Sequence, residues 1–174
     1  ANNNDVTVTV AAGSLTVTQN VTAHGSGKVD LRTGGASSDI NINNAKTISS
    51  TSGTVQLVAG RNITTDSTNN TTTEIQTTGS VLLKAGDAIG TDTNRIELAE
   101  VATLAAVAAG ASTAGDIFIR QIDGTSDALE LGAVTAVNAA SALDNTVTNL
   151  NGVVTTANNN DVTVTVAAGS LTVT

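Results

Sequence analysis

The residue types that most often carry catalysis are rare in this chain. The one histidine, His24, stands beside Gly25 in a stretch typical of a turn. No cysteine is present as a thiol nucleophile, and a Ser-His-Asp triad would have to form around that single histidine. We expect His24 to be a solvated turn residue, and we predict no catalytic residue and no enzyme activity.

Acidic residues outnumber basic ones, so a pair of carboxylates for glycoside hydrolysis is the enzyme alternative to weigh. That reaction needs two carboxyl groups roughly 5–9.5 Å apart, normally beside aromatic platforms for the sugar rings. The chain has a single aromatic residue, Phe118, and its acidic residues are dispersed. They include Asp30, Glu74, Asp116, Asp123 and Asp127. The sequence therefore argues against a carbohydrate-cleaving enzyme.

Several turn-like segments carry oxygen ligands that would suit a hard cation such as calcium. They are Asn2–Asp5, Asp87, Asp92 and Asp123–Asp127. Neither the EF-hand loop nor the glycine-rich nonapeptide of calcium-binding rolls occurs, and Asn and Asp favour turns for backbone reasons alone. We predict no metal site and no cofactor, with calcium as the alternative that these oxygens leave open.

Composition narrows the class of protein. The formal net charge is -8 and the seven basic residues are scattered singly, whereas phosphate recognition needs clustered Lys or Arg. No apolar run approaches the roughly 20 residues of a membrane span. Hydrophobic residues make up 40% of the chain, too many for a disordered protein. We expect an ordered protein with no nucleic-acid partner and no membrane insertion of this segment.

Short segments in which apolar and polar residues alternate must position any functional side chains. They are rich in β-branched residues, and strict alternation predicts strands with one buried face. The clearest are residues 6–10, 15–17, 40–42, 96–98 and 129–131. The alanine-rich segments 102–114 and 133–142 show no helix caps, so we interpret them as small-residue strands or turns. The chain is therefore predicted to be all-β.

A glycine-led pattern, Gly-x-apolar-x-apolar, recurs along the chain. It begins at Gly27, Gly53, Gly79 and Gly115, with the first three glycines 26 residues apart and the fourth 36 residues later. Periods of 20–50 residues indicate solenoids, propellers or arrays. A propeller blade needs four antiparallel strands in about 40–45 residues. The shorter period favours one coil of a β-solenoid, so we predict a parallel β-helix of about six to eight coils.

In such a solenoid, each strand stacks on its counterpart about 4.8 Å away. Valine would then lie on valine and isoleucine on isoleucine inside the coil, with Thr and Asn ladders outside. The glycine-led segments should lie in register above one another. We expect Val8 and Ile117 to point inward, so that an aspartate at either position would bury an unpaired charge.

A much longer period contains this short one. Residues 1–18 recur without change at residues 157–174. We interpret residues 1–156 as one full unit of a tandem array and residues 157–174 as the start of the next identical unit. Quasi-one-dimensional proteins grow by stacking, so adjacent identical repeats of the same chain are the expected partners. Lateral self-association into fibres is a further option.

Three strings resemble the degenerate units of filamentous-haemagglutinin-like bacterial exoproteins and related giant repetitive adhesins. They are GTVQLVAGRNIT at residues 53–64, GSVLLKAGDAIGT at residues 79–91, and LAAVAAG at residues 104–110 running to GDIFI at residues 115–119. The resemblance covers roughly residues 25–135. It implies a right-handed parallel β-helix, export across the outer membrane, an extracellular location at the bacterial cell surface, and a role in adhesion or surface structure.

Two functions remain as hypotheses. The first is a structural filament, an adhesin shaft or an extracellular fibre or sheath that gives rigid extension from the cell. The second is a direct binding module for a glycan, a host protein or ice, which would use Thr and Asn ladders. Thr-x-Thr occurs at Thr7/Thr9, Thr16/Thr18 and Thr163/Thr165. A flat ice-binding face would repeat that pair in every coil, whereas the 26-residue repeats carry Lys28/Asp30, Thr54/Gln56 and Ser80/Leu82 there.

Overall fold

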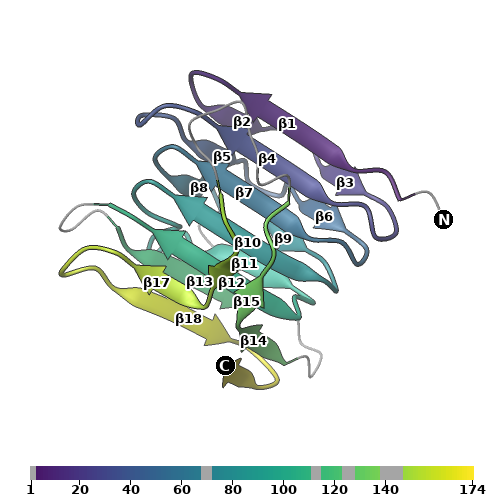
Figure 1. Cartoon of the computed structure of the whole chain (residues 1–174). Helices are drawn as coiled ribbons and strands as arrows, with labels where there is room; N and C mark the ends of the chain where they lie inside the picture. Colours follow the sequence, from purple (N-terminus) through teal and green to yellow (C-terminus); the bar gives the residue numbers. More distant parts are fainter. Residues whose placement is uncertain (1–2, 68–71, 111–114, 123–127, 138–146) are drawn as a thin grey trace.

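The computed structural model describes residues 3–67, 72–110, 115–122, 128–137 and 147–174. Every regular element in these ranges is a β-strand. Parallel strands stack turn upon turn into a β-solenoid, with the N-terminus at one end of the stack and the C-terminus at the other (Figure 1). The predicted all-β solenoid is therefore confirmed. Within the ranges described, no helix is long and apolar enough to cross a membrane.

Three columns of strands, here called faces 1, 2 and 3, form the sides of the coil. Face 1 has the longest strands and is continuous through most of the stack. Its strands are β1 (Val6–Val10), β4 (Val29–Thr33), β7 (Val55–Ala59), β10 (Ser80–Ala85), β12 (Thr103–Ala108), β14 (Leu129–Leu131), β17 (Val153–Thr155) and β19 (Leu171–Val173). Both β14 and β17 pair with β12, which places them at the same level of the stack.

Faces 2 and 3 are built from shorter strands. Face 2 consists of β2 (Leu15–Val17), β5 (Ile40–Ile42) and β8 (Ile63–Thr65), and single bridges continue it from Ile63 to Ile89 and Ile117. Face 3 consists of β3 (Val21–Ala23), β6 (Ile48–Ser50), β9 (Ile75–Gln76), β11 (Ile96–Ala99), β13 (Ile117–Gln121) and β18 (Val162–Val166). Outside the coil, β15 (Ala133–Val134) and β16 (Leu150–Asn151) form an antiparallel pair.

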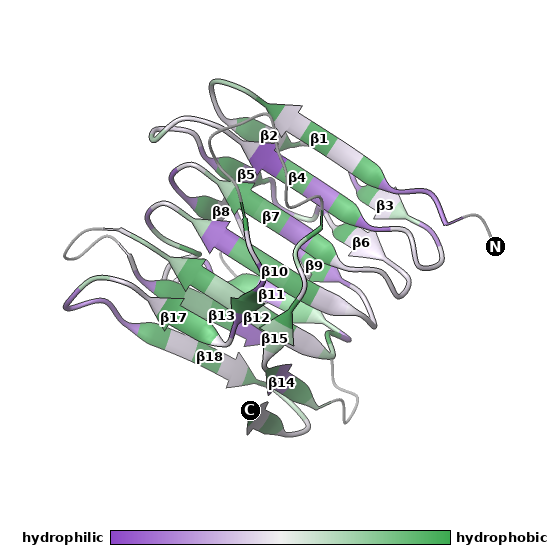
Figure 2. Ribbon diagram, viewed as in Figure 1, coloured by the Kyte–Doolittle hydropathy of each residue, from purple (hydrophilic) through white to green (hydrophobic). Residues whose placement is uncertain are grey.

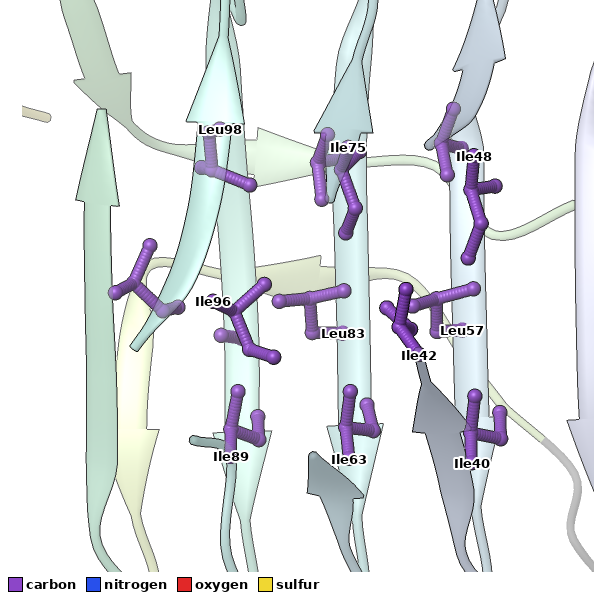
Figure 3. Packing of buried hydrophobic residues seen from close by; sticks show 14 of the residues in the cluster. Ile40, Ile42, Ile48, Leu57, Ile63, Ile75, Leu83, Ile89, Ile96 and Leu98 are labelled. Atoms are coloured by element: carbon purple, nitrogen blue, oxygen red, sulfur yellow. The ribbon is translucent and has the colours of Figure 1, made fainter. Parts of the chain in front are cut away.

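The core consists of aliphatic ladders that run along the axis. Val55 pairs with Val29 on one side and with Val81 on the other, and all three are fully buried. Ile40, Ile63 and Ile89 form an equivalent ladder on face 2, lying side by side across successive turns (Figure 3). Because the side-chain period of a strand is two, this register keeps the same side of every strand inward. The predicted stacking of like residues is confirmed here, and Figure 2 shows the alternation along β1 and β4.

The fourth glycine-led segment departs from the predicted register. The segments after Gly27, Gly53 and Gly79 stack on face 1, but the segment after Gly115 forms β13, which pairs with β11 on face 3. On face 1 its place is taken by β12, where Leu104 pairs with Val81. The reason is the length of the turn. The coil closes 23 positions after Val81, so the chain has already passed face 1 when it reaches residue 115.

The coil count is also smaller than predicted. About four regular turns, beginning with β1, β4, β7 and β10, carry a separate strand or bridge on each face, instead of six to eight. The C-terminal part of the chain is less regular because β15 and β16, which lie between β14 and β17 in the chain, pair with each other outside the coil. Residues spent on this detour add no turns to the stack.

The glycines at the start of face 1 are required by the close approach of neighbouring turns. A Cβ atom on Gly53 would overlap the carbonyl oxygen of Gly27 in the adjacent turn. At the opposite corner, a Cβ atom on Gly60 would overlap the carbonyl oxygen of Gly35. Only glycine lets two backbones approach this closely, which explains why the glycine-led pattern marks the corners of the coil.

Candidate functional site

The outer side of face 1 is buried over β4 and β7 and in part over β10, which the sequence did not predict. Side chains that alternate outward from β4, β7 and β10 would be solvated if one side of the sheet faced water. Instead Asp30, Gln56, Val58 and Leu82 are each no more than 1% exposed. On this face the expectation of a polar, solvated exterior is wrong, because a second layer covers it.

That layer is the strap, defined here as residues 133–137 and 147–151. It contains β15 and β16, and Figure 1 shows the segment around β15 crossing the strands of face 1. Val134 and Val147 of the strap pack with Val58, Leu82 and Ala105 of three successive turns in a second, smaller hydrophobic cluster. The strap therefore holds β7, β10 and β12 together from outside the coil.

A buried group of polar side chains also joins the strap to β4 and β7 of face 1. We call it the polar node: Asp30, Arg32, Gln56 and the backbone of Val137. The side-chain amide of Gln56 forms two hydrogen bonds with the backbone of Val137. Its Nε2 donates to the Val137 carbonyl oxygen at 2.8 Å, and its Oε1 accepts from the Val137 amide at 2.9 Å. Arg32 Nη2 donates to the same carbonyl at 2.6 Å.

Within the polar node, Asp30 neutralises the arginine. Arg32 Nε lies 2.9 and 3.0 Å from the two carboxylate oxygens of Asp30, and the side chains are 1% and 2% exposed. Gln56 Nε2 donates to Asp30 at 2.7 Å. Removing one partner of a buried ion pair leaves an uncompensated charge and typically costs about 3–5 kcal/mol. The node therefore fixes where the strap lies on the coil.

A pattern in the sequence could have revealed this cover. The segments VQLVA of β7 and SVLLKA of β10 place Val58 and Leu82 where a strand with one solvated side would carry polar residues. Runs of apolar residues without alternation indicate strands buried on both sides. The polar node itself had no such signal, because its partners are 81 and 105 positions apart in the chain.

Two buried glutamates form an acidic corner between faces 2 and 3. Glu74 Oε2 accepts from the backbone amide of Glu97 at 2.8 Å, and its Oε1 accepts from the Thr65 hydroxyl at 3.1 Å. Burial raises the pKa of Glu74 to about 7. Neither carboxylate oxygen of Glu97 has a hydrogen-bond partner among the described residues. Burial raises the pKa of Glu97 as well, against the opposing charges of Arg120 and Arg95. The acidic corner can therefore take up protons as the pH falls from neutral.

An ion pair clamps two turns at the corner between faces 1 and 2. Arg61 Nε donates to Asp39 Oδ1 at 2.8 Å, and the same oxygen accepts from the backbone amide of Asn62 at 3.0 Å. Asp39 precedes β5 and Arg61 precedes β8 in the next turn. The hydrogen bond from Arg61 lowers the pKa of Asp39 against the effect of burial. This corner thus has the opposite pH response to the acidic corner.

Outward ladders of polar residues are present on faces 2 and 3, as predicted. On face 2, Thr16 pairs with Asn41 and Asn41 with Thr64, whose hydroxyl donates to Asn41 Oδ1 at 2.6 Å. On face 3, the hydroxyl groups of Thr22 and Ser49 lie 3.1 Å apart. A shallow groove of about 270 Å³ follows this second ladder. It is lined by Thr22, Ala23, Ser49, Ser50, Thr51, Gln76, Thr78 and Glu100.

The remaining residues singled out from the sequence lie apart from one another. His24 is exposed in a corner, where its carbonyl oxygen accepts from the Gly27 amide at 3.1 Å. Asp5 accepts from the Lys28 amide at 2.8 Å, and Asp92 pairs with Arg95 at 2.8 Å. In the ranges that the structure describes, no three His, Cys, Asp or Glu residues gather to hold a metal ion. Asn2 and residues 123–127, including Asp123 and Asp127, lie outside these ranges.

The other acidic and threonine candidates also have structural surroundings. Asp116 Oδ1 accepts from the backbone amide of Asp161 at 2.8 Å. On face 1, Thr7 pairs with Asp30 and Thr9 with Arg32, so the threonines of β1 are not followed by threonine in the next turn. Face 1 therefore presents no flat threonine plane.

Comparison with protein-family models, with curated proteins and with solved structures finds no match. The function of the chain is therefore inferred from its own geometry.

Proposed function

We propose that this chain is a structural repeat of an exported filamentous surface protein, in which it forms a rigid shaft. The observation that carries the proposal is the continuous in-register stack of parallel strands, combined with the recurrence of residues 1–18 at residues 157–174. A solenoid turn buries its apolar face only against a neighbouring turn. A chain that repeats such turns gains length with every copy.

Stiffness has a direct physical source in this architecture. Ladders of backbone hydrogen bonds run along the axis on every face, so stretching or bending the shaft strains many bonds together. The aliphatic ladders inside add roughly 25 cal/mol per Å² of apolar surface removed from water. The strap and the Asp39–Arg61 clamp join successive turns from outside. Extension away from a cell surface is the task that these features serve.

The resemblance to large bacterial exoproteins supports the same proposal. It favours a location outside the cell, at a bacterial surface, with adjacent identical repeats as the partners of the shaft. The net charge of -8 would oppose indiscriminate aggregation of such shafts through mutual repulsion. Antibodies raised against the chain should label intact bacteria of the source; labelling only after lysis would contradict this location.

Arrays of two, three and four 156-residue units test the shaft directly by electron microscopy. From β1 and β2 to their copies β18 and β19 the chain climbs between five and six levels of the stack, the less regular C-terminal turns included. At about 4.8 Å per level, each unit should add a constant increment of about 25–30 Å to a straight rod. Ile63→Asp in every unit should abolish the rod, because Ile63 is fully buried in the face 2 ladder. Thr64→Asp is the matched control, since Thr64 points outward from the same strand. Particles that resemble beads on a flexible string would contradict the proposal.

A second candidate function is a binding module that uses the groove of face 3. Hydroxyl, amide and carboxylate groups of Thr22, Ser49, Gln76 and Glu100 line the groove, and such groups hydrogen-bond to sugars or to polar peptide segments. A glycan array probed with the chain and with a Thr22→Val/Gln76→Leu variant tests it. Retention of a glycan by the unaltered chain alone would favour binding; retention by neither chain would leave the shaft as the sole function.

A further inference from the structure

One 18-residue sequence occupies two different places in the coil. In its first copy, β1 lies on face 1 and pairs with β4. In its second copy, the identical strand is β18, which pairs with β13. Its first residue, Val162, lies on Ile117 at the end of the face 2 ladder, and the rest of the strand follows face 3. The shorter strand that follows moves as well: β2 lies on face 2, whereas its copy β19 pairs with β14 on face 1.

The two copies nevertheless have the same local structure. Each has a five-residue strand, a corner and a three-residue strand. The glycine at the corner has φ 91° at Gly13 and φ 96° at Gly169, a left-handed conformation that glycine adopts without strain. Side-chain alternation is also kept, because Val162 pairs with Ile117 and Val164 with Ile119. The same strand–corner–strand unit therefore fits more than one corner of the solenoid.

We infer that consecutive repeats join with a rotation of one face about the solenoid axis. The faces follow one another along the chain in the order 1, 2, 3. From the first copy to the second, the longer strand moves from face 1 to face 3 and the shorter strand from face 2 to face 1. In the order of the faces, each strand has advanced by a whole number of turns plus two faces. This is equivalent to a rotation of one face in the opposite direction. Three repeats are then needed before a given residue returns to its starting face.

This inference rests on the proposed function, since it describes how units of an array meet. The surface at the C-terminal end fits such a junction. Val162, Leu171 and Val173 are 45%, 43% and 75% exposed there, so the edges of β18 and β19 are accessible to a further turn. In the first copy, β4 covers the edge of β1 by pairing Val29 with Val6. The same pairing in the next unit would lay the copy of Val29 on Val162, beneath face 3.

The rotation would distribute the surface features of the shaft around its axis. Within one unit the strap stiffens face 1 alone. A strap in each unit, turned by one face per repeat, would support all three sides in succession and make bending resistance similar in every direction. The groove of face 3 would be displayed on all sides in the same way.

Disulfide mapping in the 174-residue chain tests the offset, and the chain contains no native cysteine to interfere. Parallel neighbours about 4.8 Å apart fall within the Cα distance of a disulfide, about 4.4–6.8 Å. Phe118→Cys with Thr163→Cys should therefore form a disulfide on mild oxidation, because these residues are paired in β13 and β18. Glu130→Cys with Thr172→Cys should do so too.

The comparison pair is Glu130→Cys with Thr163→Cys, which should remain reduced. It would bridge if the second copy stacked on face 1, as β1 does in the first. Bridging of this pair, together with no bridge between positions 118 and 163, would overturn the rotation.

Electron cryomicroscopy of a three-unit array extends the test to complete repeats. Straps on three different sides of a straight rod support the rotation. A straight rod with all straps on one side overturns the rotation but leaves the shaft function intact. Flexible particles without a common axis overturn both.

Discussion

β7 on face 1 and β8 on face 2 belong to the same turn, yet their burial differs. All five residues of β7 are buried, whereas in β8 the central Thr64 is partly exposed between two buried neighbours. Both strands contribute inward aliphatic side chains to the same core, so the difference lies entirely on the outer side. Face 1 is covered there by the strap, and face 2 meets solvent through its Thr and Asn ladder.

The comparison shows that one solenoid can combine two kinds of face, one covered on its outer side and one exposed to solvent. The inner ladder is common to both and sets the fold. The outer layer differs from face to face. It determines whether the outer side of a face is covered by tertiary contacts or is accessible to a partner. Mutations on the inner side should therefore act alike on all faces, whereas mutations on the outer side should separate them.

Ile117→Asp should have the largest effect. Ile117 is fully buried in the face 2 ladder, so the substitution would place an unpaired charge in the core and lower the free energy of unfolding by more than about 4 kcal/mol. Val8→Asp is the control. Val8 points inward opposite Leu31, but it is 36% exposed because, among the described strands, β1 pairs only with β4. Its loss should be far smaller in urea unfolding. Equal losses would show that the end turn is as closed as the interior.

Arg32→Ala, compared with a variant of face 2, should show most clearly that the outer sides of faces 1 and 2 contribute differently to stability. Arg32 lies in the polar node on the outer side of face 1, and its removal leaves Asp30 buried without its arginine, at a cost of about 3–5 kcal/mol. Thr64→Ala on the outer side of face 2 should cost about 1 kcal/mol or less, since it removes one partly exposed hydrogen bond. Chemical denaturation measures both.

A double variant sharpens the test of the polar node. Asp30→Leu combined with Arg32→Met removes both charges, and replacing a buried ion pair by apolar residues is often neutral or stabilising. It should recover most of the stability lost in Arg32→Ala. If Arg32→Ala alone behaves like Thr64→Ala, the strap does not clamp face 1.

Sequence reasoning succeeded where alternation alone decides the structure. Ile40 and Ile63 lie at inward positions of short alternating segments, and their stacking follows from one periodicity and one turn length. The fourth glycine-led segment shows where this reasoning ends. Gly115 marks a corner as Gly53 does, but a corner pattern contains no information about which face follows, and here the turn length changed from 26 to 23 residues.

The outer layer was beyond reach for a different reason. Gln56 appears in the sequence as an ordinary outward polar residue, and only a segment 81 positions later makes it part of a buried node. Glu74 and Glu97 likewise come together only once the register of the turns is known. Contacts of this kind depend on the path of the whole chain, and local patterns do not encode them.

The acidic corner should make stability depend on pH near neutrality. Burial raises the pKa of Glu74 from about 4.3 when unfolded to about 7 when folded, so the folded state holds a proton that the unfolded state releases. This contribution is fully present below pH ~4.3 and is lost as the pH rises through about 7, by at most about 4 kcal/mol. Burial acts on the Glu97 pKa in the same direction. Unfolding curves should therefore show lower stability at pH 8 than at pH 5.

Glu74→Gln should reduce this slope, because the amide carries no proton equilibrium. Asp39→Asn is the matched control, taken from the Asp39–Arg61 ion pair at the corner between faces 1 and 2. Arg61 lowers the pKa of Asp39, so its contribution is present above the unfolded pKa and is lost only in more acidic solution. The control should keep the slope between pH 5 and pH 8. An unchanged slope in Glu74→Gln would mean that Glu74 is ionised throughout the range.

His24→Ala should have the smallest effect. Comparing it with Gly27→Ala in the same corner distinguishes a role of the imidazole from the backbone geometry of the corner. The imidazole is exposed, and the hydrogen bond to Gly27 uses the backbone carbonyl of His24, which alanine retains. We expect the free energy of unfolding to change by no more than about 0.5 kcal/mol. Gly27→Ala adds a single methyl group three residues away and should cost more, because its Cβ would overlap the backbone of Asn4 in the adjacent turn. Thermal unfolding distinguishes the two. A larger loss in His24→Ala than in Gly27→Ala would assign the imidazole a role that the corner geometry does not provide.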